Sequence, residues 1–138
     1  MPMTDTVARQ IADLLNSQNE LTVDYTAAKV LEHDRYIVRL DDSGNVIGAV
    51  EVKKVKWYQC EIDHLSVHPD AKRRGLGTSL LGEAEARARQ LGARVAQCTI
   101  RVGNAPSEGL FKKAGYISTV TFVNAANGNR VTVYQKVL

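Results

Sequence analysis

Two acidic side chains, Glu61 and Asp63, stand two residues apart in a segment that leads into a basic glycine loop. Side chains alternate along a strand, so both carboxylates would share one face, together with Leu65 if the strand has no bulge. A carboxylate on a strand face can take a proton from a bound amine, which makes Glu61 and Asp63 candidates for a general base. The alternative is that both only line a solvated cleft or pair with nearby lysines.

The loop that follows this segment has the features of an anion site. Residues 68–78 read His-Pro-Asp-Ala-Lys-Arg-Arg-Gly-Leu-Gly-Thr and open a predicted helix. A helix N-terminus offers unpaired amides and a partial positive charge, which suit a phosphate. Gly75 and Gly77 would let phosphate oxygens approach those amides closely. Three cations precede the glycines: Lys72, Arg73 and Arg74.

Two familiar nucleotide-binding loops are excluded by the residues around Gly77. A Walker loop requires a lysine after the last glycine, and here Thr78 and Ser79 follow. A dinucleotide-binding loop requires a third glycine, and Leu80 stands at that position. The loop therefore needs a different interpretation.

A second motif completes the pattern. Residues 104–116 read Asn-Ala-Pro-Ser-Glu-Gly-Leu-Phe-Lys-Lys-Ala-Gly-Tyr. The two motifs, in this order, resemble the coenzyme A-binding core of the GNAT superfamily, the acetyl-coenzyme A-dependent N-acetyltransferases. The strong resemblance covers about fifty residues. Lys72 stands where the family usually has Arg or Gln, which keeps a charge but loses the planar guanidinium fork.

The resemblance implies a binding site for acetyl-coenzyme A. The strand end before the loop is bulged in the family and aligns the pantetheine arm. The cofactor-binding residues that the resemblance implies are Leu65, Ser66, Val67, Lys72, Arg73, Arg74, Gly75, Leu76, Gly77, Thr78, Asn104, Ser107, Phe111 and Lys113. The resemblance also makes Glu61 the first choice for the base and Asp63 the second. Family members commonly carry a tyrosine at the position of Phe111, whose hydroxyl protonates the leaving thiolate, and Phe111 cannot do so.

The implied function is an N-acetyltransferase that moves an acetyl group from acetyl-coenzyme A to a primary amine by direct attack in a ternary complex. No metal is expected, because the histidines and cysteines show no ligand spacing. Nothing marks an activating partner for Cys60 as an acyl-carrying nucleophile. One alternative is a catalytically weak acyl-coenzyme A-binding GNAT module, suggested by Phe111. Another is a toxin-like acetyltransferase acting on aminoacyl-tRNA, suggested by small size and basic clusters.

The composition and charge indicate which kinds of partner and which cellular compartment to expect. The 138 residues predict a single GNAT domain over 1–138, and the net charge of +3 is mild. The basic clusters lack interleaved aromatic residues, so nucleic acid is not expected as a direct ligand. We expect a cytoplasmic protein, since no signal peptide or apolar run of about 20 residues is present. The acceptor, a small-molecule or peptide amine, is not readable, and the choice between a monomer and a homodimer stays open.

Periodicity and turn signals predict a single α/β domain with a C-terminal β-hairpin. The resemblance implies that this domain has the GNAT fold, a mixed central β-sheet flanked by helices. The expected helices are 4–16, 25–33, 78–91 and 104–114, and the expected strands are 35–40, 46–56, 58–67, 94–102, 117–123 and 130–137. The third helix would carry two ion pairs at i,i+4 spacing, Glu83 with Arg87 and Glu85 with Arg89.

Overall fold

The computed structural model describes residues 3–18 and 35–138. The helices are α1 (Asp5–Gln18), the short 3₁₀ helix η1 (Pro69–Arg74), α3 (Leu76–Gln90) and α4 (Ala105–Lys113). The strands are β1 (Tyr36–Leu40), β2 (Val46–Lys56), β3 (Gln59–Val67), β4 (Val95–Arg101), β5 (Ile117–Val123) and β6 (Arg130–Val137). The second helix predicted from the sequence, 25–33, lies outside the described residues.

The strands form one mixed sheet in the order β1-β2-β3-β4-β6-β5. β3 and β4 pair in parallel, and the other neighbouring strands pair antiparallel. A parallel pair needs a long crossover connection, which is supplied here by η1 and α3. The predicted α/β fold with a mixed sheet and a C-terminal hairpin is confirmed, and β5 and β6 have the predicted bounds.

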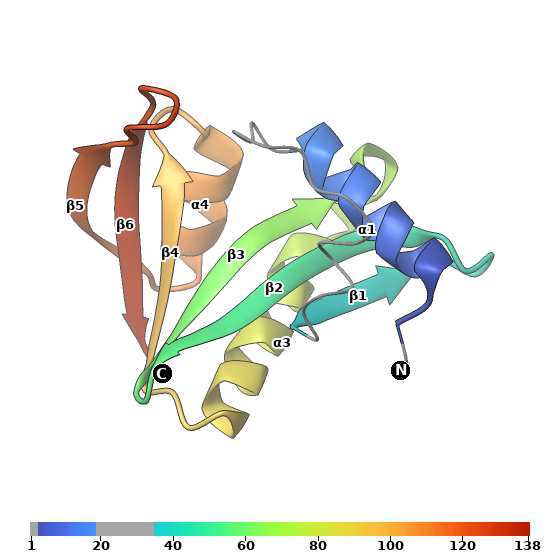
Figure 1. Ribbon diagram of the computed structural model, residues 1–138, viewed down its shortest axis with the longest axis horizontal. Coiled ribbons are helices and arrows are strands. Elements are labelled where there is room, and N and C mark those ends of the chain that lie inside the picture. The colour runs from blue at the N-terminus through green and yellow to red at the C-terminus, as the bar shows by residue number, and fades with distance from the viewer. Residues whose placement is uncertain (1–2, 19–34) are drawn as a thin grey trace.

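Helices cover both faces of the sheet. α1 lies in front of β1 and β2 in Figure 1, and α3 and α4 lie behind the sheet. The front core joins α1 residues such as Ile11 and Leu15 to Val46 and Ala49 of β2. The larger rear core joins α3 and α4 to the central strands. The sheet therefore presents one face to α1 and the other to the two helices of the glycine loop and the second motif.

α3 differs in two ways from the helix predicted. Leu91, expected on its buried face, is 41% exposed and lies just past the last turn. The two i,i+4 ion pairs are also absent from the bonds of the described residues. Glu83 instead pairs with Arg39 of β1, while Glu85 accepts hydrogen bonds from Tyr116 and Lys136. The pairs within the helix do not form because Glu83 and Glu85 face the sheet. There the cations of two strands and the hydroxyl of Tyr116 are within bonding distance.

β3 and β4 separate soon after they meet. Their register holds for three residue pairs, ending at Glu61 and Gln97. Beyond that point β3 stays paired with β2, while β4 stays paired with β6. Figure 1 shows the two strands diverging toward their C-terminal ends. The sheet therefore opens into a V whose arms end at the glycine loop and at the start of α4.

A bulge interrupts β3 near its end. The register with β2 pairs Asp63 with Glu51 and Ser66 with Ala49, so β3 has one extra residue between these pairs. His64 occupies this stretch with φ of 54°, a left-handed conformation that non-glycine residues seldom adopt. The bulge reverses the alternation of side chains. Leu65 consequently packs in the rear core, and it does not share the face of Glu61 and Asp63 on which an unbulged strand would have placed it.

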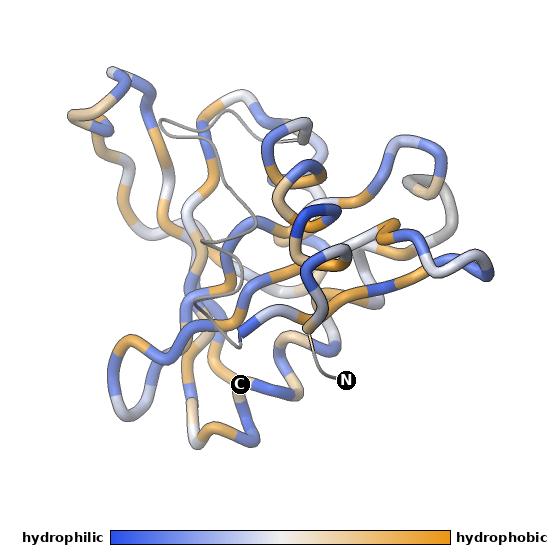
Figure 2. The backbone as a smooth tube through the Cα atoms, turned by 45° about the vertical axis from the view of Figure 1, so that its right-hand side comes forward, coloured by the Kyte–Doolittle hydropathy of each residue, from blue (hydrophilic) through white to orange (hydrophobic). Residues whose placement is uncertain are grey.

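Hydrophobic and hydrophilic residues alternate along the strands and helices, as the mixed colours of the tube in Figure 2 show. None of the helices within 3–18 and 35–138 has the length and apolar character to cross a membrane.

Candidate functional site

The two candidate bases lie on the front face of β3, just before the strands part. In the β2–β3 register Glu61 is opposite Lys53 and Asp63 is opposite Glu51. Glu51 is buried and lies 3.5 Å from the Nε atom of Arg35. Three carboxylates and two cations therefore share this part of the front face, and both candidate bases are half-buried within it.

This environment raises the pKa of both candidate bases. Burial is the main cause for Glu61, and the negative charge of Asp63 adds to it. A hydrogen bond from Gln97 and the charge of Lys53 act in the opposite direction. Burial also raises the pKa of Asp63, against the effect of the charge of His64. A carboxylate with a raised pKa is a stronger base, which suits proton removal near neutral pH.

Two glutamines hold Glu61 from the neighbouring strands. Gln97 of β4 donates from Nε2 to Oε1 of Glu61 over 2.6 Å. Gln135 of β6 donates from Nε2 to Oε1 of Gln97, also over 2.6 Å. Sequence reasoning missed both residues, because a single glutamine on a strand carries no signal. Only the strand order β3-β4-β6 places them beside the carboxylate.

The glycine loop prepares the first turn of α3 to accept an anion. Gly75 ends η1 and begins α3 with φ of 70°, which glycine adopts without strain. No side chain caps this helix, and the first intrahelical bond there runs from the Ser79 amide to the Gly75 carbonyl. The amides of residues 76–78 precede that bond and have no helical acceptor. These amides are the donors that the predicted anion site calls for, and anion binding at this turn stays a prediction.

Gly77 faces the gap between the two arms of the V. A Cβ atom at this position would be 3.5 Å from Leu110 of α4 and 3.9 Å from Val67 of β3. The loop, the end of β3 and the second motif are thus brought together at one place. Leu76 joins the rear core beside them, and Thr78 is exposed. The side chains of residues 72–74 lie outside what the structure describes.

The remaining residues of the bulged strand and the turn have defined roles. Ser66 is buried, and its hydroxyl donates to the carbonyl of His64 over 3.0 Å, across the bulge. Val67 packs with Leu65 in the rear core. His68 caps η1 by accepting a hydrogen bond from the Asp70 amide, as expected for a turn residue.

The second motif forms a capped helix that faces the V. Asn104 precedes α4, and its side-chain oxygen accepts a bond from the Ser107 amide. Ser107 is half-buried in the first turn, whereas Lys113 is exposed in the last. Gly115, with φ of 98°, ends the helix as predicted. These positions set Asn104 and Ser107 near the opening and Lys113 at the far end of α4.

Phe111 lies in the core rather than on an open surface. Its side chain is 4% exposed, and its ring meets that of Tyr116 edge to face with centroids 5.0 Å apart. Tyr116 is the core aromatic that the sequence predicted, and its hydroxyl donates to Glu85. A ring this buried leaves only an edge for a ligand, so contact between Phe111 and a cofactor stays a prediction.

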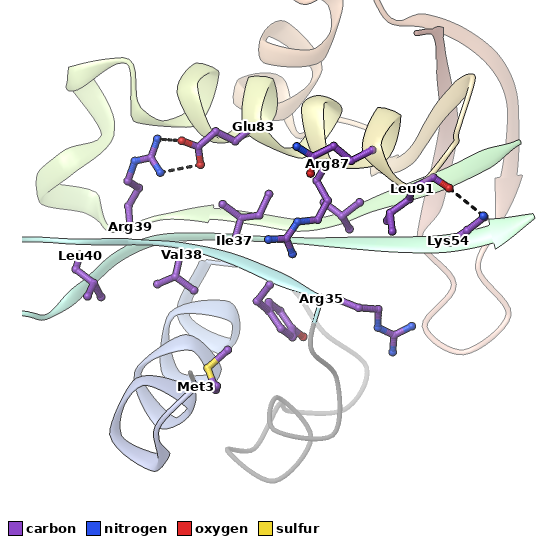
Figure 3. A pocket seen from close by; sticks show the side chains of 13 residues that line it. Met3, Arg35, Ile37, Val38, Arg39, Leu40, Lys54, Glu83, Arg87 and Leu91 are labelled. Carbon is purple, nitrogen blue, oxygen red and sulfur yellow. Dashed lines mark hydrogen bonds and ion pairs between the residues drawn. The ribbon is translucent and has the colours of Figure 1, made fainter. Parts of the chain in front are cut away.

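A separate basic groove of about 810 Å³ runs along β1, two strands away from β3. Figure 3 shows Arg39 bonded to Glu83 above this strand, and Lys54 bonded to the carbonyl of Leu91 at one end. Arg87 also lines it. Among the residues described at the site, Arg35 also lines this groove.

Residues 8–116 match the Acetyltransferase (GNAT) family, which is more than half of the chain. The chain therefore belongs to the GNAT acetyltransferase family. Its members are enzymes, and the glycine loop and the second motif, residues 104–116, are the features by which the sequence resembled them. None of the curated protein sequences compared with this chain proved similar enough to count as a relative.

Solved structures share the fold across the whole chain. Ard1 from Thermoplasma volcanium superposes with a TM-score of 0.87 at 17% identity, covering 100% of this chain and 95% of that one. The NatC complex bound to Gag peptide and CoA superposes with a TM-score of 0.85 at 14% identity, covering 100% and 96%. A GNAT family acetyltransferase from Elizabethkingia anophelis with acetyl-CoA bound reaches 0.65 at 16% identity, covering 71% and 72%.

Proposed function

We propose that this protein transfers an acetyl group from acetyl-coenzyme A to a primary amine in a ternary complex, with Glu61 as the general base. The observation that carries the proposal is the position of Glu61, the last β3 residue paired with β4 before the V opens. A base at this point lies between the front face of β3, where an acceptor amine would bind, and the gap of the V, where the thioester arm would bind.

The residues around the gap fit acetyl-coenzyme A. The uncapped amides of residues 76–78 suit its phosphates, and Gly77 leaves space between Val67 and Leu110 for the arm that follows. Beyond Glu61 the β4-facing backbone of β3 has no partner strand in the described sheet. Such a backbone can bond an extended amide-containing arm as a strand would. When bound, the molecule supplies the acetyl thioester.

The front face suits a cationic acceptor. A primary amine is protonated near neutral pH, and the carboxylates of Glu51, Glu61 and Asp63 on this face favour its approach. Attack on the thioester requires the neutral amine, so a proton must leave. Glu61, with its raised pKa, would accept that proton directly or through a water molecule.

Direct attack is favoured over a cysteine-bound acetyl intermediate. Cys60 and Cys98 are both buried in the rear core, and burial raises the pKa of each thiol. The reactive species would be the thiolate, which this environment disfavours. Neither cysteine therefore offers a route to a covalent acyl-enzyme.

A second candidate is an acyl-coenzyme A-binding module with little turnover. Phe111 supports it, because its ring has no hydroxyl to protonate the leaving thiolate. The two candidates separate in one experiment: tight acetyl-coenzyme A binding with no consumption in the presence of any amine would favour the binding module.

The test of the proposal is Glu61→Gln, assayed with an amine found by screening small amines, antibiotics and peptides for acetyl-coenzyme A consumption. Peptides belong in the screen because one structure with this fold holds a peptide and CoA. We expect turnover to fall by about 10²–10⁴-fold near neutral pH, the usual contribution of a positioned base. Affinity for acetyl-coenzyme A should stay unchanged, and activity should recover at high pH. Wild-type turnover in this variant would contradict the assignment of Glu61.

A further inference from the structure

Three side chains on three neighbouring strands form a hydrogen-bond chain that ends on Glu61. The strand register places Glu61 beside Gln97, and Gln97 beside Gln135. Both bonds in the chain measure 2.6 Å, and each runs from an amide nitrogen to an oxygen. The chain crosses from β3 to β6 on the front face, at the apex of the V.

The direction of this chain follows from what each member can donate or accept. A carboxamide has one donating end and one accepting end, whereas a carboxylate only accepts. Because Gln135 donates to the oxygen of Gln97, the nitrogen of Gln97 is left to face Glu61. If the Gln97 amide were reversed, its oxygen would face the carboxylate oxygen, and the bond would require a protonated Glu61.

We propose that Gln97 and Gln135 are positioning residues for Glu61, with the bond from Gln135 stabilising the orientation of the Gln97 amide in which Gln97 donates to the ionised base. This inference rests on the proposed function in assigning the base role to Glu61. Gln97 occupies Oε1 of Glu61, so the bond restricts the rotation of the carboxylate.

Several other groups also act on the pKa of Glu61. In the described part of the molecule these are Asp63 on its own strand, Lys53 on β2 and a hydrogen bond from Gln59. Burial and Asp63 favour the protonated form, while Lys53, Gln59 and Gln97 favour the carboxylate. Loss of the Gln97 bond should therefore raise the pKa of Glu61 further. Turnover would then begin at a higher pH.

The test compares substitutions of Gln135 that differ in what they can donate. Gln135→Lys only donates and should preserve the orientation of Gln97. The side chain of Gln135→Leu neither donates nor accepts a hydrogen bond. The side chain of Gln135→Glu only accepts, so it should reverse the amide of Gln97. We expect Gln135→Leu and Gln135→Glu to lower turnover by up to about tenfold and move the acidic limb of the pH profile upward, a smaller effect than loss of the base itself. The KM for acetyl-coenzyme A should not change.

A double-mutant cycle separates orientation from charge. In a Gln97→Leu background, Gln135→Glu acts on Glu61 only through its charge, and Gln135→Leu should have no effect. The pKa of the Glu61 carboxyl can be followed by ¹³C NMR in the protein without substrate. Substitution of Gln135 should shift this pKa more when residue 97 is Gln than when it is Leu. Gln90→Leu, at the exposed end of α3, serves as a control for glutamine removal.

The outcomes distinguish the inference from the proposed function. Equal shifts in both backgrounds, or an unchanged pH profile in Gln135→Leu, would overturn the positioning role while Glu61→Gln still abolished turnover. If Glu61→Gln were fully active, the base assignment would fail instead. The NMR titration would then still decide whether Gln135 orients Gln97 toward Glu61.

Discussion

Gly48 of β2 lies directly against Leu80 of α3: a Cβ atom built on Gly48 would stand 2.8 Å from Cδ1 of Leu80. Leu80 is fully buried, so its side chain has little room to move. The same Cβ atom would be 3.2 Å from Leu76, in the first turn of the helix. This close approach sets how near the glycine-loop helix lies to the sheet.

Gly48→Ala should consequently destabilise the protein by about 1–2 kcal/mol, the usual cost of overpacking a filled core. Displacement of Leu76 should also weaken acetyl-coenzyme A binding, because it moves the first turn of α3. Gly82→Ala is the matched control, since a Cβ atom there meets nothing within 4 Å, and it should stabilise the helix by about 1 kcal/mol. Thermal unfolding and calorimetry would measure both. Equal stability of the two variants would contradict the packing argument.

Gly77→Glu tests the anion site. The added carbon fits at ordinary contact distance from Leu110 and Val67, but the negative charge opposes the phosphates of the ligand. We expect acetyl-coenzyme A affinity, measured by calorimetry, to become undetectable while circular dichroism stays native. Gly82→Glu carries the same charge at an exposed site of the same helix and should bind normally. Unchanged affinity in Gly77→Glu would remove the loop from the binding site.

Phe111→Tyr tests the residue at which this chain departs from the family pattern. A leaving thiolate has a pKa near that of a free thiol, about 8.5, so it departs without help but benefits from a proton donor. If the ring edge faces the sulfur, the new hydroxyl should raise turnover, by up to about 10²–10⁴-fold, with affinity within a few-fold of wild type. Loss of stability with flat turnover would instead show that the hydroxyl points into the core beside Tyr116.

Asp63→Asn tests the cost of a half-buried charge. Because the pKa of Asp63 is raised, the folded protein binds its proton more tightly than the unfolded chain does. The free energy of unfolding should therefore fall as pH rises from the ordinary to the raised pKa, and the cost persists above it. The variant should be more stable than wild type near neutral pH, by about 0.5–2 kcal/mol, and equal to it at about pH 3.

The same substitution should move the acidic limb of the activity profile downward, because the charge of Asp63 contributes to the raised pKa of Glu61. Asp42→Asn, in the exposed β1–β2 turn, provides the control. A stability gain that did not depend on pH would show that the charge of Asp63 is not its cause.

The sequence predicted those features that local patterns determine. The bounds of β5 and β6, the helix stop at Gly115 and the opening of a helix after Gly75 follow from alternation and from glycine chemistry. The resemblance implied a bulge at the end of this strand, but local patterns did not place it at His64, because a register shift depends on the partner strand.

The hydrogen-bond chain that ends on Glu61 was also not predicted from the sequence. Gln97 and Gln135 are 38 residues apart, and only the sheet order makes them neighbours. Glu83 likewise had a suitable partner within its own helix, yet it pairs with Arg39 across the fold. Long-range contacts of this kind carry no periodic signal in the chain.

The brief parallel pairing of β3 with β4 also bears on the order in which the chain folds. β2–β3 and β5–β6 are local antiparallel hairpins, and such pairs form early because little chain entropy is lost in closing them. The β3–β4 seam must close across the whole of η1 and α3, and it gains only three residue pairs in return. We therefore expect the apex that carries Glu61 and Gln97 to assemble late in folding. A chain emerging during synthesis would then bring its candidate base into place only after the hairpins on either side had formed.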